Sequence, residues 1–162
     1  MGLIRLLPVL LLAGCMSTHV EPLAYTDTVT MDVCHSEPHT LDATFDAIAA
    51  THGIVNRWHV LDADLANDDP ALLFARVTDC DWIVLYRGTA AHALVCVLLA
   101  CQAGHTYAAI HRPDAVIVLY LETEGIARHE WLHAMGCDHG DEKETCAAQI
   151  GYRRSQIAIN SG

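Results

Sequence analysis

The stretch AVIVLYLETEGIARHEWLHAMGCDHG, residues 115–140, decides the fold that we expect for this chain. It opens with a near-continuous apolar run, Ala115 to Leu121, which favours an interior strand covered on both faces of a sheet. A turn at Pro113-Asp114 precedes that strand. After it, Thr123 can act as the N-cap of a helix that we predict over Ile126 to Met135.

Two histidines of this predicted helix stand four residues apart. His129 and His133 would share one helix face with Cβ atoms about 5–6 Å apart, so both rings can reach one zinc ion at about 2.0–2.1 Å. Glu130 points about 100° further round the helix, where its carboxylate can reach a water on that ion. Gly136 can take the positive φ of a sharp turn, which returns His139 to the metal. Three histidines leave the fourth zinc position open, as in catalytic sites.

The segment HEWLHAMGCDH resembles the zinc signature HExxHxxGxxH of the metzincin peptidases. The resemblance covers about eleven residues and implies a metzincin-like zincin fold of the α+β class, a twisted sheet with the active-site helix after the last strand. It implies one catalytic Zn²⁺ on His129, His133 and His139. Glu130 would be the general base and acid, and a peptide or protein would be the substrate, lying extended along a sheet edge.

The sequence departs from the metzincin pattern downstream of the zinc motif. Metzincins place a methionine in a tight turn beneath the zinc, whereas no methionine follows His139 here. Ala147, Ala148 or Gln149 would occupy that turn. Tyr152 is a candidate for stabilising the oxyanion, and a buried packing tyrosine is the alternative.

The first half of the chain predicts a strand, a helix and a second strand. Alternating apolar residues predict a half-buried strand over Tyr25 to Val33. Thr40 is the expected N-cap of a helix that ends at Gly53, and Arg57 to Leu61 is the next strand. The acidic segment Asp62 to Pro70 could hold calcium, but it matches no full calcium-loop pattern, which favours a solvated turn.

The middle of the chain is rich in strand candidates. Ala71 to Arg76 is a short helix started by Pro70, and Trp82 to Tyr86 is a buried strand. Ala93 to Ala100 and Thr106 to Ile110 are further strands, separated by a turn at Gln102 to His105. The order of a strand, a helix, several strands and a long C-terminal helix predicts a layered α/β or α+β domain with a mixed sheet.

The N-terminus resembles a bacterial lipoprotein signal. Arg5 precedes an apolar run that is too short to span a bilayer, and the run ends in Leu-Ala-Gly-Cys at residues 12–15, which resembles a lipobox. We therefore expect a signal peptide over residues 1–14, lipid on Cys15, a tether over 15–24 and one catalytic domain over 25–162. An ordinary signal peptide with a chance cysteine is the alternative. Met16 after the cysteine implies the outer membrane of the cell envelope.

Charge and cysteine content narrow the partners and the compartment. The formal net charge is −11, so nucleic acid is excluded as a partner because phosphate contacts need cations. Export predicts disulfides. A bond between Cys137 and Cys146 would fix the third zinc ligand, although each could pair with a distant cysteine such as Cys34 or Cys80. Cys96 and Cys101 could pair with each other.

Three functions are compatible with these patterns. The first is a lipid-anchored zinc endopeptidase. The second is a non-catalytic zinc-binding surface lipoprotein that serves as an interaction or metal-scavenging module, and the third is an anchored structural protein without metal. For Cys34, a structural disulfide is the default interpretation. The alternatives are a metal cluster of Cys34, His35 and His39, or a Cys34 thiol that covers the zinc.

Overall fold

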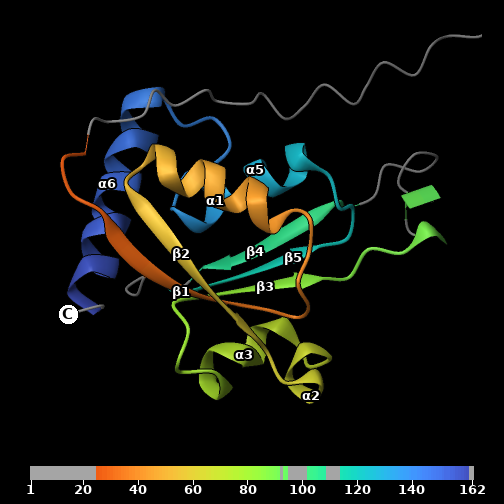
Figure 1. The fold of residues 1–162 in the computed structure, drawn as a ribbon. Helices are drawn as coiled ribbons and strands as arrows, with labels where there is room; N and C mark the ends of the chain where they lie inside the picture. Colours follow the sequence, from red (N-terminus) through yellow and green to blue (C-terminus); the bar gives the residue numbers. More distant parts are fainter. Residues whose placement is uncertain (1–24, 92, 95–101, 109–113, 161–162) are drawn as a thin grey trace, which may run out of the picture.

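Five strands form one twisted sheet in the computed structural model, which describes residues 25–91, 93–94, 102–108 and 114–160 (Figure 1). The strands are β1 (Val29–His35), β2 (Ile54–Val60), β3 (Trp82–Tyr86), β4 (Gly104–Ala108) and β5 (Ala115–Leu119). Their order across the sheet is β2-β1-β3-β5-β4. All neighbours pair in parallel except β4, which runs antiparallel to β5. The predicted mixed sheet is confirmed.

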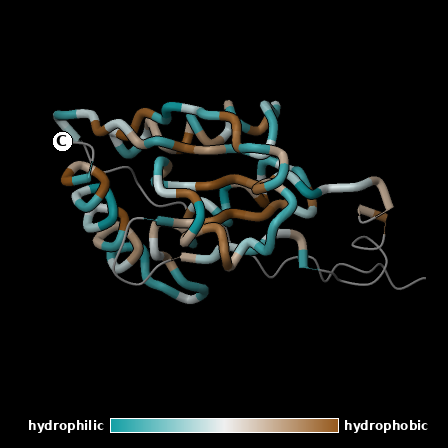
Figure 2. Tube along the Cα trace, turned by 90° about the horizontal axis from the view of Figure 1, so that it is seen from below, coloured by the Kyte–Doolittle hydropathy of each residue, from teal (hydrophilic) through white to brown (hydrophobic). Residues whose placement is uncertain are grey.

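Helices cover both faces of the sheet (Figure 1). One face carries α1 (Asp42–Thr51), α5 (Glu124–Ala134) and α6 (Lys143–Asn160), and the other carries α2 (Ala63–Ala66) and α3 (Pro70–Arg76). Figure 2 shows that the most hydrophobic parts of the trace lie in the strands at the centre of the molecule. This arrangement confirms the coarse expectation of strands and helices packed in layers around one mixed sheet.

The core lies on both faces of the central strands. Every residue of β3 and β5 is buried, as a near-continuous apolar run predicts for interior strands. The larger core includes Phe45, Trp82 and Trp131 under α1, α5 and α6. The smaller core includes Leu73 and Leu85 under α3. The larger core contains Ala127, Trp131 and Ala134 of α5, and it therefore fixes the helix that carries His129 and His133.

Two predicted strands are present with shifted ends. In β1, Val29 and Val33 are buried while Thr30 is exposed, so the predicted alternation is confirmed for these residues. The strand nevertheless starts at Val29 rather than Tyr25. The second strand starts at Ile54, three residues before the predicted Arg57, because β1 pairs along its whole length with β2. The hydrophobic pattern of residues 54–56 does not reveal this long-range pairing.

Several local predictions were wrong. The segment Asp62 to Pro70 is not one continuous turn, since Ala63–Ala66 forms the short helix α2. Gln102 to His105 is not a turn throughout, because β4 already begins at Gly104. Ala93 and Leu94, at the start of the predicted strand over 93–100, are helical. The remainder of that strand, together with residues 109–110, lies outside the described residues.

The two predicted helix boundaries around α1 had different outcomes. Thr40 is not the N-cap, because the helix begins at Asp42 after Leu41, without a side-chain cap. The carboxylate of Asp42 instead accepts a hydrogen bond from the main-chain N–H of His39. Gly53 does follow the helix with a φ of +66°, and its closeness to Tyr25 Cβ leaves no room for a side chain. The predicted role of Pro70 at the start of α3 is confirmed.

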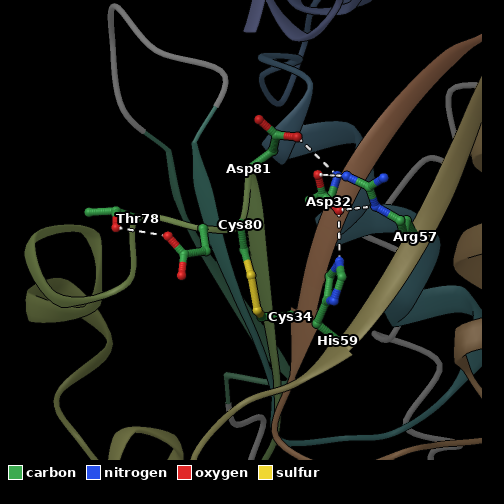
Figure 3. The surroundings of a disulfide bond; sticks show 8 residues. Asp32, Cys34, Arg57, His59, Thr78, Cys80 and Asp81 are labelled. Atoms are coloured by element: carbon green, nitrogen blue, oxygen red, sulfur yellow. Dashed lines mark hydrogen bonds and ion pairs between the residues drawn. A yellow bond between two sulfur atoms is a disulfide. The ribbon is translucent and has the colours of Figure 1, made fainter. Parts of the chain in front are cut away.

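A disulfide joins Cys34 of β1 to Cys80, just before β3 (Figure 3). Beside it, Asp32 accepts hydrogen bonds from Arg57 and His59 of β2, and Asp81 accepts one from the Asp32 main chain. The bonds from Arg57 hold the pKa of Asp32 below its ordinary value, whereas burial raises the pKa of Asp81. The disulfide and these polar contacts link three neighbouring segments of the sheet.

The predicted export and anchoring segments are not covered by the structure. Residues 1–14, the lipid-bearing Cys15, the tether over 15–24 and the pair Cys96 and Cys101 all lie outside the described residues. Within the described ranges, no helix has both the length and the apolar character needed to cross a membrane.

Candidate metal centre

Helix α5 is held at its start by the predicted cap. Thr123 accepts a hydrogen bond from the Ile126 N–H at 3.4 Å, and Glu124 in the first turn complements the helix dipole. Ala127, Trp131 and Ala134 are buried against the sheet. Burial of that face leaves His129 and His133 on the side of the helix that faces a pocket.

The predicted turn at Gly136 ends α5. Gly136 has a φ of +93°. Its N–H bonds to the carbonyl of His133 at 2.9 Å, and the next N–H, of Cys137, bonds back to Leu132 at 3.0 Å. This pair of bonds is the Schellman motif, which requires a left-handed residue and therefore favours glycine. The chain reverses here and returns His139 toward the helix.

A disulfide and a hydrogen bond restrain the loop that contains His139. Cys137 and Cys146 form a disulfide, as one of the alternatives predicted, and both cysteines are buried. The carboxylate of Asp141 accepts a hydrogen bond from the Asp138 N–H at 2.7 Å. The Cys137–Cys146 disulfide closes the short loop that contains His139, so the backbone of that residue has few alternative conformations.

The three predicted ligands converge through the same ring atom. The Nε2 atom of His133 lies 3.1 Å from Nε2 of His129 and 3.2 Å from Nε2 of His139. Three nitrogens bound to a tetrahedral zinc at 2.0–2.1 Å would be about 3.3–3.4 Å apart, by the geometry of the tetrahedron. Both distances from His133 are within a few tenths of an ångström of these values, and the ligand atoms of all three histidines lie within 4.8 Å of one another. The cluster is the one group of three metal-binding side chains found among the described residues.

Hydrogen bonding sets the tautomer of His133, and burial favours the neutral form of His129. His133 Nδ1 donates to the carbonyl of Cys137 at 2.7 Å, which leaves Nε2 of the neutral ring with a free lone pair. Burial, and next the neighbouring rings of His133 and His139, lower the pKa of His129. His129 is therefore neutral near pH 7 and able to donate electrons to a metal.

Glu130 lies beside the cluster and is only 5% exposed. It faces the same pocket as the three histidines. Its Oε2 atom accepts a hydrogen bond from the Thr106 hydroxyl at 2.7 Å. The carboxylate is therefore held by a hydrogen bond in the pocket of the three histidines and is largely shielded from bulk water.

The pocket has a volume of about 530 Å³ and is built from two sides. One side is the segment from α5 to the third histidine: His129, Glu130, His133, Asp138 and His139. The other is Gln102 together with strand β4: Gly104, His105, Thr106 and Ala108. The residues of the second side were not predicted as part of the site. They reach α5 because β4 pairs with β5, and this pairing cannot be seen in the local sequence. The only local signal was the predicted strand starting at Thr106.

Two predictions made around the downstream turn were wrong. Ala147, Ala148 and Gln149 lie inside α6, so no turn follows the third histidine there. The run after Gly140 is rich in helix formers, and α6 packs directly against the turn at Gly136. Tyr152 is neither buried nor part of the pocket; it is exposed, and its hydroxyl accepts a hydrogen bond from Gln156.

The proposed cluster of Cys34, His35 and His39 is also wrong. Cys34 is bonded to Cys80 and has no free thiol. His35 donates to the Asp42 carboxylate at 3.0 Å, and His39 lies 3.1 Å from Glu122. The default interpretation of Cys34 as a structural cysteine is confirmed.

Comparison with known proteins adds no assignment to this geometry. No protein-family model matches the chain, and no curated protein or solved structure is significantly similar to it.

Proposed function

We propose that this chain is a zinc-dependent endopeptidase with His129, His133 and His139 as metal ligands and Glu130 as the catalytic base. The observation that carries the proposal is the meeting of three Nε2 atoms at 3.1 and 3.2 Å beside a buried carboxylate. Three imidazoles leave one position of a tetrahedral zinc for water or substrate.

The chemistry follows from the donor set and its neighbour. A bound zinc would lower the pKa of its water toward neutrality and polarise a scissile carbonyl. Glu130 accepts the proton of the attacking water and returns it to the leaving amine. His133 is held in the required tautomer by its bond to Cys137. The pocket opens beside β4, an edge strand along which an extended peptide can lie by strand addition.

The order of elements supports a metzincin-like assignment. Helix α5 directly follows β5, the last strand, as the resemblance implies. The helical path of residues 147–149 departs from it, because the methionine turn has no counterpart at the expected position. That departure favours a second candidate, a zinc-binding lipoprotein without catalysis that serves as an interaction or metal-scavenging module.

One experiment separates the two candidates. Purified wild type and Glu130→Ala are loaded with zinc, and metal content and cleavage of a mixed peptide library are measured before and after chelation. The peptidase proposal expects about one zinc per chain in both proteins and cleavage by wild type alone, abolished by the chelator. Zinc in both proteins without cleavage by either would favour the binding module.

We also propose that the protein is anchored to the bacterial envelope, at the outer membrane, by lipid on Cys15. The proposal rests on the apolar run and the Leu-Ala-Gly-Cys sequence at residues 12–15. Mass spectrometry of protein from membranes should find acyl mass on wild type and not on Cys15→Ser. A soluble wild type of the same mass as the variant, apart from the substitution, would refute the anchor.

A further inference from the structure

Strand β4 lies against the side chain of Glu130 through two residues on one face. Gly104 and Thr106 are two positions apart, so their side-chain positions point to the same side of the strand. Both line the pocket that contains the three histidines. Neither belongs to the zinc motif, and their approach to Glu130 depends on the antiparallel pairing of β4 with β5.

The contact at Gly104 leaves no room for a side chain unless Glu130 moves. A Cβ atom placed there would be 2.7 Å from Oε1 of Glu130, 2.8 Å from its Cγ and 2.9 Å from its Cδ. Because three atoms of the side chain would clash, rotation of the carboxylate alone cannot relieve the overlap. The Glu130 side chain occupies the space that a side chain at position 104 would fill.

The contact at Thr106 involves one hydroxyl and two acceptors of the same residue. Its Oγ1 lies 2.7 Å from Oε2 of Glu130 and 3.0 Å from the Glu130 main-chain carbonyl. With Glu130 ionised, the hydroxyl donates to Oε2. The hydroxyl has one hydrogen, and the shorter of the two distances is the one to the carboxylate oxygen.

From these contacts we infer that β4 positions the general base: Thr106 holds the Glu130 carboxylate by hydrogen bonding, and Gly104 provides the space for it. This inference rests on the proposed peptidase function. Thr106 is a positioning residue, because it touches neither the metal ligands' ring nitrogens nor, in the proposed mechanism, the reacting atoms. Its hydroxyl fixes the orientation of the Glu130 carboxylate within the space that Gly104 leaves.

The kinetic test compares Thr106→Val with Thr106→Ser. Valine has nearly the same shape but no hydroxyl, so we expect kcat to fall about 10–100-fold, with KM and zinc content nearly unchanged. Serine keeps the hydroxyl and should restore kcat to within about threefold. Thr78→Val is the matched control, since the Thr78 hydroxyl is exposed and bonds to its neighbour Asp79 on the surface. Equal kcat in Thr106→Val and wild type would overturn the inference, as would failure of serine to restore kcat.

Gly104→Ala tests the second contact. We expect loss of cleavage at full zinc content, because the new methyl group must displace Glu130. Gly125→Ala is the matched control on α5, where an added Cβ meets no atom within 4 Å, and it should cleave like wild type. Full activity of Gly104→Ala would show that the close packing has no catalytic role.

A readout independent of catalysis distinguishes this inference from the proposed function. In a double-mutant cycle, Thr106→Val and Glu130→Ala should shift the urea unfolding midpoint non-additively, because each substitution removes one end of the hydrogen bond between the Thr106 hydroxyl and the Glu130 carboxylate. Additive shifts would overturn the inference even if wild type is an active peptidase. Non-additive shifts with an inactive, zinc-loaded wild type would support the contact and refute the proposed function.

Discussion

Two polar regions of this molecule each contain a group of histidines, and the ring nitrogens of the two groups have different partners. At the candidate metal centre, Nε2 atoms of His129, His133 and His139 face one another without a carboxylate between them. At the carboxyl end of β1, His35 bonds to Asp42 and His39 bonds to Glu122. Histidines whose nitrogens are taken up by carboxylates hold loops together, whereas those with inward lone pairs can bind a cation.

The second region is a closed hydrogen-bond network. His39 Nδ1 accepts the Leu41 N–H at 3.1 Å, so its Nε2 carries the proton that goes to Glu122. The other oxygen of Asp42 accepts the Tyr86 hydroxyl at 2.6 Å. Burial, and then this bond, raise the pKa of Tyr86. This network joins the ends of β1, β3 and β5 to the start of α1, and its role is structural.

The largest expected difference between the metal centre and the network at the carboxyl end of β1 is in zinc affinity, when one histidine of each is replaced. His133→Ala takes away a central ligand and its bond to Cys137, so zinc affinity should fall by more than about a hundredfold, beyond the usual loss for an outer contact. His39→Gln should keep full zinc affinity. Competition with a fluorescent chelator measures both. Equal zinc affinity in His133→Ala and wild type would remove the distinction.

The two disulfides sharpen the comparison. Replacing Cys137 and Cys146 by serine should lower the free energy of unfolding by about 3 kcal/mol from loop entropy and also weaken zinc binding, because the loop of His139 is released. Replacing Cys34 and Cys80 opens a longer loop and should lower it by about 4 kcal/mol, with zinc affinity retained. Urea denaturation and zinc titration of the two double variants test this, and equal zinc affinities would contradict it.

A smaller effect is expected from Asp42→Ala. The substitution removes the acceptor for His35, Tyr86 and the His39 N–H, so we expect the free energy of unfolding to fall by about 2–3 kcal/mol. Zinc content and cleavage should be unchanged. If Asp42→Ala lost its zinc without unfolding, the carboxyl-end network would be part of the metal centre after all.

The smallest expected effect concerns His52, a third kind of histidine that is buried and stacked on Trp131. Burial lowers its pKa, so the unfolded chain binds this proton more readily than the folded one. Its contribution to stability is complete above pH of about 6.5, the unfolded value, and is lost as the pH falls below it. Urea midpoints at pH 7.5 and 5.5 should therefore differ less in His52→Phe than in wild type. Identical pH dependence of the two proteins would refute this.

The parts of the fold that follow from short-range pattern were predictable. The apolar run of β5, the cap at Thr123 and the helix end at Gly136 are each encoded within a few residues. The spacing of His129 and His133 on one helix face is likewise a local property.

The parts that depend on contacts distant in sequence were not predictable. Nothing near Ile54 reveals that β2 pairs along all of β1, and nothing near Gly104 reveals Glu130 as its neighbour. The turn over residues 147–149 was expected from the resemblance to metzincins alone. The local sequence there favours helix, and these residues lie inside α6. The sequence also left the partners of Cys137 and Cys34 open, since pairing depends on the folded positions of distant cysteines.

X-ray absorption spectroscopy at the zinc edge tests the central claim most directly. For wild type loaded with one zinc per chain, the account predicts a first shell of three imidazole nitrogens and one oxygen at about 2.0–2.1 Å, with one imidazole lost in His139→Ala. A sulfur ligand at about 2.3 Å, or a spectrum unchanged by His139→Ala, would contradict it.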